Sequence, residues 1–550
     1  MGLQFRTLNG WGPESGECCR CLAGDKSMNI LGIGGILHDA AAAVLSNGEL
    51  VAAIEQRKLT HAEQPGELPV AAWEQCLKIA GIASDQVDAV SIARPWQTGS
   101  EERIHLELRE RFPSAQLLVV DHQLAHAASA YLASPFDDAT VLTLDRLGDF
   151  RCGARWSGQG NTLSVDRELY YPDSLGDLYG RVTRLLGYRS NADEHKVQWL
   201  SASGEPRFLD CFRNLFHARG VEWPAVRRDF LNTESATGTF HPRFFRELGI
   251  APDALSESEK ADLARAVQDA LAETVLEMAG EHRNLCLAGG VAFNALLVEA
   301  MERSGRFPSV FVQPAAGNSG TALGAALHAW HTFVPDAPRV AFDSMYLGPE
   351  FSSEEIKQVL ENCKLNFRYL LTTENLVRAT IEELRDFKIV AWMQGRMEFG
   401  PRALGNRSIL ASPLNPYSTE NLNLYIKHRE SFRKFAASVP EEDASTYFEV
   451  GTNARFLATV GRVRPEYREK FAHALLGEEV IRIHTVRASD NPLYHRLLKA
   501  QGAATGLPVL YNTSFNLFQD PLVCTPRDAV RSFYSSGIDV LFAGHFLLTK

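Results

Sequence analysis

The chain has 550 residues, of which 45% are hydrophobic and 22% charged, and its formal net charge is −11. This composition is typical of an α/β protein with at least two domains, each long enough to bury a core. The acidic balance argues against a general nucleic-acid binder, because such a protein needs a basic face for the phosphate backbone. No apolar run approaches the roughly 18 residues of a membrane helix, and we find no signal peptide.

The cysteines and the first residues indicate the compartment and the start of the fold. Nine cysteines, an odd number without a secretion signal, predict reduced thiols in the cytoplasm. Cys18, Cys19 and Cys21 are close together, but no second pair follows at zinc spacing. Residues 1–27 are polar and without periodicity, so we expect a disordered or non-native extension before Met28.

Two similar strand units predict a duplicated sheet in the first part of the chain. The first unit comprises the predicted strands Asn29–Gly34, Ala40–Ser46 and Glu49–Gln56, the last two joined by Asn47-Gly48, a type I′ hairpin signal. The second unit comprises Ala139–Leu144, Arg151–Trp156 and Leu163–Tyr171. Internal repetition of this kind is stronger evidence than the propensity of any one segment.

Helices are expected between and after these units. The further predicted elements are the helix Ala71–Ala80, the strand Leu117–Val120, the helix Gln123–Leu132 capped by Asp121, the long helix Glu257–Ala279 within a mostly helical stretch 205–285, the strands Asn284–Ala288 and Val310–Gln313, the helix Thr321–His331, and the strand Ile389–Met393. We therefore predict one domain over 28–335, a proline-containing linker over 336–352 and a second domain over 353–550.

Three residues form a candidate metal site. His122 and His126 are four residues apart on a predicted helix, so their imidazoles project from one face. Such a pair alone is often simple packing, but Asp145 follows a buried strand, where α/β enzymes place ligand groups. Two imidazoles and a carboxylate suit a divalent transition metal, iron or zinc among them.

Two glycine turns are candidate phosphate sites. Gly289-Gly290 and Gly317–Gly320 each join a predicted strand to a helix, where main-chain N–H groups can cradle a phosphate. The alternative is that each is only a tight turn. Two such turns on one duplicated sheet favour a bound nucleotide.

The second domain concentrates cations against an acidic background. The segment 395–410 carries Arg396, Arg402 and Arg407 among glycines, and arginine presents a planar fork of donors that matches phosphate or carboxylate. Lys427, Arg433 and Arg482 follow, and Asn512 and Ser514 lie at the end of an apolar strand. Charge runs are usually solvated, an interpretation that we keep for Lys434. The others favour a polyanion pocket and an enzyme that handles ATP or an acyl phosphate.

The same motifs resemble a known family. The segments in question are Gly34–Asp39, Asp121–Tyr131, Ser134–Phe136, Ser174–Gly176, Gly289–Asn294, Gly395–Leu410, Lys427–Phe435 and Asn512–Asn516. From about Met28 to the end, the chain resembles the O-carbamoyltransferases of antibiotic and nodulation-factor biosynthesis, the NodU/CmcH type. This resemblance implies a duplicated actin/sugar-kinase-like domain followed by a YrdC-like α/β domain.

The resemblance also implies a reaction and its participants. The second domain would make carbamoyl adenylate from carbamoyl phosphate and ATP, with Mg²⁺ accompanying the ATP. The first would pass the carbamoyl group to the hydroxyl of a small-molecule natural product. A homodimer is an open alternative, and we expect no nucleic-acid or membrane partner.

Roles for individual residues follow from the resemblance. It implies catalytic roles for His38 as a base and for Arg402, Lys427, Arg433, Arg482 and Ser514 around the phosphates. It implies cofactor contacts from Lys196, Gly289, Gly290, Asn294, Gly317, Gly320, Arg396, Arg407 and Asn512. His122, His126 and Asp145 match the family's ligands for Fe²⁺ or another divalent metal, and Asn318 stands at the fourth ligand position.

The chain departs from the family pattern at several of these places. Asn318 replaces an aspartate, which removes an anionic ligand and should lower metal affinity. Arg146 and Trp199 replace small residues, and Lys434 and Ala437 replace prolines. Most departures fall in the first domain. The alternative is therefore a divergent paralogue with altered or lost transfer activity that acts as a binding or partner protein.

Overall fold

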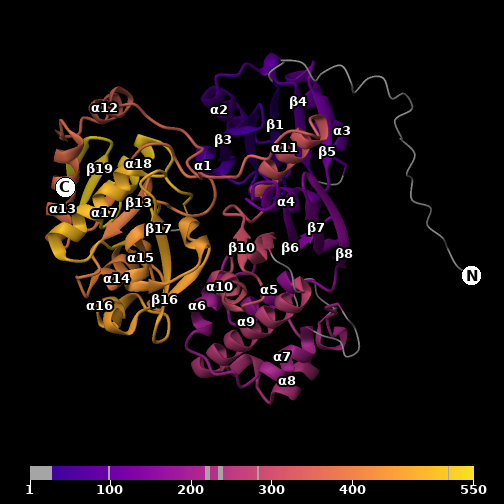
Figure 1. Cartoon of the computed structure of the whole chain (residues 1–550). Coiled ribbons are helices and arrows are strands. Elements are labelled where there is room, and N and C mark those ends of the chain that lie inside the picture. Colours follow the sequence, from indigo (N-terminus) through magenta and orange to yellow (C-terminus); the bar gives the residue numbers. More distant parts are fainter. Residues whose placement is uncertain (1–27, 97–98, 217–222, 233–238, 281–283, 518–519) are drawn as a thin grey trace, which may run out of the picture.

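The protein has two bodies, which lie side by side (Figure 1). The computed structural model describes residues 28–96, 99–216, 223–232, 239–280, 284–517 and 520–550. The expectations for residues 1–27, including the cysteine trio, lie outside this part. No helix within these ranges is both long and apolar enough to cross a membrane.

The first sheet is mixed and five-stranded. Its strands are β1 (Asn29–Gly34), β2 (Ala41–Ser46), β3 (Glu49–Glu55), β4 (Ala89–Ala93) and β5 (Gln116–Val120), in the order β3-β2-β1-β4-β5. β1 pairs antiparallel with β2 and parallel with β4. Asn47 and Gly48 both have positive φ, 52° and 83°, as the expected type I′ turn between β2 and β3 requires.

The second sheet repeats the topology of the first. Its strands are β6 (Asp138–Gly148), β7 (Arg151–Gln159), β8 (Thr162–Tyr170), β9 (Asn284–Ala288) and β10 (Ser309–Val312), in the order β10-β9-β6-β7-β8. β6 pairs antiparallel with β7 and parallel with β9, as β1 does with β2 and β4. The predicted duplication and the actin/sugar-kinase-like α/β class are thus confirmed.

Two helices pack against each other at the centre of the duplicated body. They are α4 (His122–Tyr131), capped by Asp121 as predicted, and α11 (Gly320–Phe333). A Cβ atom at Gly324 of α11 would lie only 1.8 Å from the main-chain oxygen of Ala125 on α4. This approach is possible because α4 is rich in Ala and α11 in Ala and Gly, and it fixes the helix that carries His122 and His126.

The remaining helices of this body pack on the sheets or on one another. They are α1 (Gln56–Thr60), α2 (Val70–Ala80), α3 (Glu101–Arg111), α5 (Leu175–Leu185), α6 (Glu194–Ser201), α7 (Leu209–Phe216), α8 (Pro242–Leu248), α9 (Glu257–Ala279) and α10 (Ala295–Arg303). The capping box Ser256–Glu259 begins α9, and its buried face joins a large apolar core with α5 and α7.

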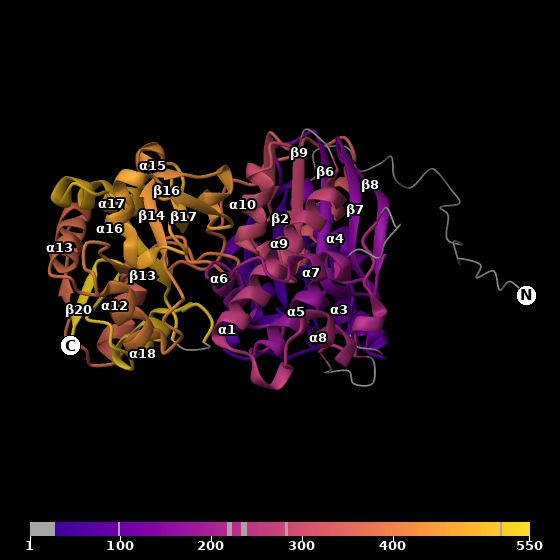
Figure 2. The ribbon, with the colours of Figure 1, turned by 90° about the horizontal axis from the view of Figure 1, so that it is seen from below.

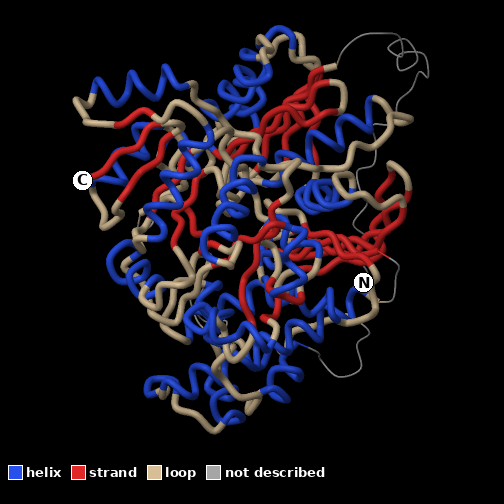
Figure 3. Tube along the Cα trace, turned by 60° about the vertical axis from the view of Figure 1, so that its left-hand side comes forward, coloured by secondary structure: helices blue, strands red, loops and turns tan. Residues whose placement is uncertain are grey.

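The second body is built on one ten-stranded sheet (Figure 3). Its strands are β11 (Arg368–Tyr369), β12 (Val390–Met393), β13 (Arg407–Ala411), β14 (Ala436–Pro440), β15 (Phe448–Glu449), β16 (Val460–Val463), β17 (Val480–Val486), β18 (Leu510–Ser514), β19 (Val540–Ala543) and β20 (Phe546–Thr549). Its helices are α12 (Ser353–Asn362), α13 (Thr373–Arg385), α14 (Ser418–Asn421), α15 (Glu441–Tyr447), α16 (Arg468–Phe471), α17 (Pro492–Thr505) and α18 (Pro526–Tyr534).

The connection between the bodies has no regular structure. Residues 334–352 contain neither helix nor strand. The domain boundaries and the YrdC-like class of the second body stay predictions.

Candidate active site

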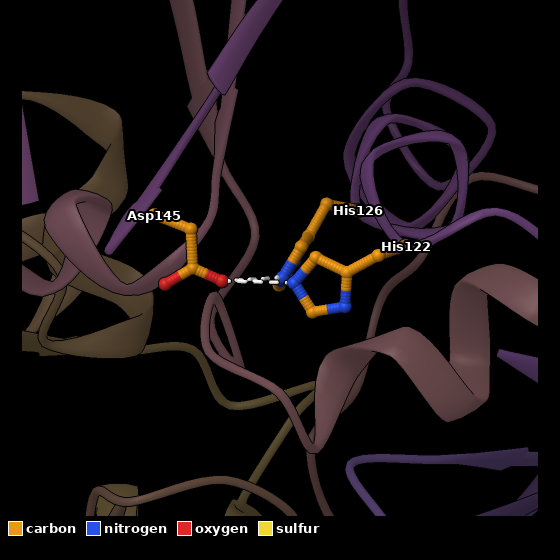
Figure 4. A group of neighbouring side chains, drawn as sticks. All are labelled: His122, His126 and Asp145. Atoms are coloured by element: carbon orange, nitrogen blue, oxygen red, sulfur yellow. Dashed lines mark hydrogen bonds and ion pairs between the residues drawn. The ribbon is translucent and has the colours of Figure 1, made fainter. Parts of the chain in front are cut away.

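His122, His126 and Asp145 meet between α4 and the end of β6 (Figure 4). The carboxylate Oδ2 of Asp145 lies 2.9 Å from Nε2 of His122 and 3.3 Å from Nε2 of His126. The three potential ligand atoms all lie within 4.8 Å of one another. The sequence predicted these three residues as a metal site, and the structure brings them together from two separate elements, α4 and β6.

Neighbouring main chain fixes this geometry. Nδ1 of His122 lies 3.0 Å from the carbonyl oxygen of Arg94, to which it donates, so Nε2 is directed at Asp145. The main-chain N–H of Arg146 donates to Oδ1 of Asp145 at 2.9 Å. A Cβ atom at Gly148 would lie 2.1 Å from Cδ2 of His122, so only glycine leaves this ring in place.

The protonation states of Asp145 and His126 suit a cation, whereas the raised pKa of His122 favours a proton that competes with it. Burial opposes ionisation of Asp145, but hydrogen bonds from His122 and His126 outweigh burial and hold its pKa far below the usual range. Burial lowers the pKa of His126, so this imidazole is neutral. Burial also acts against the charge of His122, but Asp145 overcomes it and raises the pKa of that ring.

His126 provides the test of whether a metal fits. Its side chain is fully buried. Within the described ranges Nδ1 has no hydrogen-bond partner, and Nε2 has only the 3.3 Å contact with Oδ2 of Asp145, which is not a well-aligned hydrogen bond. A buried imidazole that is so poorly satisfied is costly, and a metal ion at Nε2 would give this nitrogen a well-aligned partner. The donor set of two imidazoles and one carboxylate therefore fits a divalent transition metal.

The two glycine turns lie next to each other. The N–H of Gly289 donates to the carbonyl oxygen of Ala316 at 2.8 Å, which joins the loop after β9 to the loop before α11. Gly289 has φ of 89°, and a Cβ there would lie 2.2 Å from the carbonyl oxygen of Leu144. A Cβ at Gly290 would lie 3.2 Å from Oδ1 of Asp145, so this loop borders the metal group.

A second candidate site in the C-terminal body gathers cations. Lys427 is buried, and its Nζ donates to the main-chain oxygens of Ser514 (2.6 Å) and Asn516 (2.9 Å) and to Oδ1 of Asn516 (2.6 Å). Nε of Arg433 and Nε of Arg482 are buried without a hydrogen-bond partner in the part of the chain that the structure describes.

Electrostatic coupling shows that these cations share one environment. Burial, and then the charge of Arg433, lowers the pKa of Arg402 to about 10. Burial lowers the pKa of Arg482 strongly, and the charges of Arg402 and Arg433 add to that effect. Burial also lowers the pKa of Lys427 strongly, and the charges of Arg429 and Arg433 add to that effect. We call these residues the cation cluster: Arg402, Lys427, Arg433 and Arg482. Their mutual repulsion makes the cluster receptive to an anion.

Comparison with known proteins decides the family. The model described as Carbamoyltransferase N-terminus matches residues 104–327, and the model described as Carbamoyltransferase C-terminus matches residues 381–550. The chain belongs to the carbamoyltransferase family. The predicted family, and with it a carbamoyltransferase enzyme, is therefore confirmed.

Individual relatives of this carbamoyltransferase match nearly the whole chain. An uncharacterized Synechocystis protein is 34% identical over 95% of this chain and 97% of its own length. Nodulation protein NolNO of Sinorhizobium fredii is 31% identical over 94% of this chain and 79% of its own. The 3'-hydroxymethylcephem-O-carbamoyltransferase of Amycolatopsis lactamdurans is 27% identical over 92% and 96%.

Two arginines of this carbamoyltransferase do not join the cation cluster. Arg396 donates to the main-chain oxygens of Val51 (2.9 Å), Leu347 (2.7 Å) and Gly348 (3.2 Å). Arg407 is fully buried and donates to four carbonyl oxygens, those of Gln394, Gly395, Asn406 and Pro349. Both guanidiniums hold main chain together, so we leave them out of the site, although the sequence suggested cofactor contacts.

Other predicted residues have partners within the protein. The side-chain amide of Asn294 caps α10 and pairs with Gln268, and Nζ of Lys196 lies 2.7 Å from Oε1 of Glu430. A Cβ at Gly317 would lie 2.7 Å from the ring of Phe293, and one at Gly320 would lie 2.1 Å from the oxygen of Ala315. These glycines are thus required by close packing.

The polar residues at the end of β18 lie beside the cluster. Nδ2 of Asn512 donates to the oxygen of Ala403 at 3.0 Å, which leaves its buried Oδ1 without a partner in the described ranges. Ser514 donates through Oγ to Oδ1 of Asn516, which also accepts from Lys427. The catalytic or binding roles of these residues, of exposed His38 and of Asn318 stay predictions.

Sequence reasoning assigned no role to two further residues beside the cluster. The guanidinium of Arg429 lies 4.5 Å from the ring centroid of Phe435, and burial followed by the charge of Arg433 lowers its pKa to about 9. His195 is neutral, because burial and the charges of Arg433, Arg402, Lys196 and Arg429 lower its pKa to about 2. Arg429 lay within a segment already singled out, whereas nothing in the sequence marks His195.

Proposed function

We propose that this enzyme is an ATP-dependent O-carbamoyltransferase that works in two stages. In the first, water hydrolyses carbamoyl phosphate to carbamate and phosphate, and a carbamate oxygen attacks the α-phosphorus of ATP. The bond to pyrophosphate breaks, and carbamoyl adenylate forms. In the second, a hydroxyl oxygen of a small molecule attacks the carbamoyl carbon, the hydroxyl proton is released, and AMP leaves.

The cluster around Arg482 carries the first stage in this proposal. Carbamoyl phosphate and ATP carry dense negative charge, so the attack of an anionic carbamate on ATP is opposed by repulsion. Arg402, Arg433 and Arg482 neutralise that charge, and their own mutual repulsion makes an anion the most favourable partner. The free Oδ1 of Asn512 accepts a hydrogen bond from the carbamoyl amide or the adenine.

The group around Asp145 carries the second stage. His122, His126 and Asp145 would hold a divalent metal, which supplies Lewis-acid polarisation when bound. The loop at Gly290 borders Asp145, and the joined loops after β9 and before α11 would supply main-chain contacts to the adenylate. The rigid packing of α4 on α11 keeps both imidazoles oriented without reorganisation.

One observation supports this proposal above all others. The buried Nε atoms of Arg433 and Arg482 have no partner within the described ranges, although every unmet buried donor costs free energy. A ligand with several acceptor oxygens removes that cost. The name of the 3'-hydroxymethylcephem-O-carbamoyltransferase relative is consistent with a hydroxyl of a small molecule as acceptor.

The test is release of pyrophosphate without any acceptor. The protein is incubated with Mg²⁺, ATP and carbamoyl phosphate, and pyrophosphate is measured with an enzyme-coupled assay. We expect release that requires both substrates. Release from ATP alone would refute the role of carbamoyl phosphate in the first stage, and no release would favour a binding or partner protein on the same fold.

A further inference from the structure

Helix α6 of the N-terminal body lies against the C-terminal body. Both Figure 1 and Figure 2 place it at the junction of the two. Nζ of Lys196 lies 2.7 Å from Oε1 of Glu430 across this junction. The helix is therefore fixed in rotation, and the residues on the same face are presented to the cation cluster.

Trp199 on this helix covers Arg482. The guanidinium carbon of Arg482 lies 5.1 Å from the centroid of the indole ring, within the range of a cation–π contact. The ring is only 7% exposed. His195 lies one helical turn earlier on α6. After burial, the charges of Arg433 and Arg402 lower the pKa of its imidazole, so the same face of α6 covers the rest of the cluster.

An apolar cluster locks the indole in this place. Trp199 packs in it with Ala295, Val460 and Leu476, and Phe432 lies at its edge. Val460 on β16 is the direct antiparallel partner of Arg482 on β17, so the two side chains stand on the same face of the sheet. Trp199 thus packs against Val460 on β16 as well as against Arg482 on the neighbouring strand β17.

A ring differs from a carboxylate as a support for arginine. Arg402 and Arg433 repel the guanidinium of Arg482, which has many rotamers, and a carboxylate partner would hold it but neutralise its charge. The face of an indole holds the cation and leaves its N–H donors and its full charge available. This arrangement suits an arginine that must bind an anionic ligand.

We propose that Trp199 is a positioning residue of the anion pocket, holding Arg482 in place so that the N-terminal body forms part of the pocket. The inference rests on the proposed function for the identity of the anions, carbamoyl phosphate and ATP. Trp199 replaces a small residue of the family pattern, so this support is specific to chains that carry a large aromatic side chain here.

The test uses binding of inorganic pyrophosphate, measured by titration calorimetry on the full chain. Trp199→Leu should weaken binding about threefold to tenfold, because the cation–π contact is lost. Trp199→Phe keeps an aromatic face and should stay within about twofold of the wild type. Trp223→Leu is the matched control, since Arg155 and Arg167 lie 5.5 and 5.8 Å from that ring, and it should bind like the wild type.

A second measurement does not depend on the stability of Trp199→Leu. Pyrophosphate should change the fluorescence of Trp199, seen as the difference between wild type and Trp199→Phe, because the ligand moves the adjoining guanidinium. Wild-type affinity in Trp199→Leu, or no such fluorescence difference, would overturn the positioning role and leave the proposed function intact. Failure of the wild type to bind pyrophosphate would overturn both.

Discussion

Lys58 and Glu398 meet although 340 residues separate them in sequence. Nζ of Lys58 donates to the main-chain oxygen of Glu398 at 2.9 Å and to that of Gly400 at 2.7 Å. Oε1 of Glu398 accepts from the main-chain N–H groups of Leu404, Asn406 and Arg407. The segment 395–410 is therefore first a structural joint between the two bodies, and of its three arginines Arg402 belongs to the cation cluster.

Breaking this joint should destabilise the protein. Lys58→Met removes the partner of Glu55, whose Oε2 lies 2.9 Å from Nζ, and leaves that carboxylate buried. We expect the free energy of unfolding to fall by about 3–5 kcal/mol, measured by chemical denaturation. Lys357→Met, at a half-exposed position on α12, should change it by less than about 1 kcal/mol. A loss of the same size in both variants would contradict a special role for Lys58.

Arg482 should behave in the opposite way. Arg482→Gln removes one of several mutually repelling buried cations, so the free energy of unfolding should stay equal or rise. The rate of pyrophosphate formation should fall at least about 100-fold, because charge developing on the phosphates is no longer neutralised. Arg496→Gln, an exposed position on α17, controls for the loss of an arginine as such. Full activity in Arg482→Gln would show that the cluster has another purpose.

Titration of Lys427 should make the free energy of unfolding and the pyrophosphate affinity change with pH in opposite directions. Its pKa in the folded protein lies well below the ordinary lysine value, because of burial and then the charges of Arg429 and Arg433. Between these two values the unfolded chain binds more protons, so the free energy of unfolding of the ligand-free protein rises with pH. The cation is lost in the same window, so pyrophosphate affinity falls.

Both trends are measurable on one protein. Thermal unfolding and calorimetric titrations over a series of alkaline buffers give the two slopes. Lys427→Met should flatten each of them, since the titrating group is gone. Equal slopes in wild type and Lys427→Met would assign the pH dependence to other groups.

A substitution at Gly148 should affect the metal site of the second stage and leave the first stage unchanged. In Gly148→Ala the new methyl group would lie 2.1 Å from Cδ2 of His122, so the ring must move away from Asp145. We expect loss of bound transition metal by elemental analysis, together with wild-type pyrophosphate release from ATP and carbamoyl phosphate. Unchanged metal content in this variant would mean that His122 is not a ligand.

Asn318 makes a complementary prediction. An aspartate at this position would add an anionic ligand, so Asn318→Asp should bind a divalent transition metal at least about tenfold more tightly if the residue faces the site. Competition with a chromophoric chelator measures this change. Equal affinity in the two proteins would place Asn318 outside the coordination sphere.

The sequence predicted the duplicated body well for physical reasons. Its strands are short and apolar and end at turn residues, and the Asn47-Gly48 signal fixed the first hairpin. The metal group was also predictable, since His122 and His126 lie on one helix face and Asp145 follows a strand. The elements of the ten-stranded sheet were mostly missed, because strands such as β11 and β15 have only two residues and no period.

The arginines show where sequence reasoning ends. Arg396, Arg402 and Arg407 occur in one glycine-rich segment, and composition alone cannot separate them. The fold directs Arg396 and Arg407 to main-chain oxygens and Arg402 to the cluster. The neutral His195 and the indole of Trp199 join the cluster through a long-range contact between bodies, which no local pattern encodes.

Calorimetric titration with carbamoyl phosphate tests the central claim most directly. The wild type should bind it, and Arg482→Gln should bind it at least about 100-fold more weakly while unfolding at the same temperature or higher. Equal affinity in the two proteins, or no binding by the wild type, would contradict a carbamoyl phosphate pocket among the buried cations of the C-terminal body.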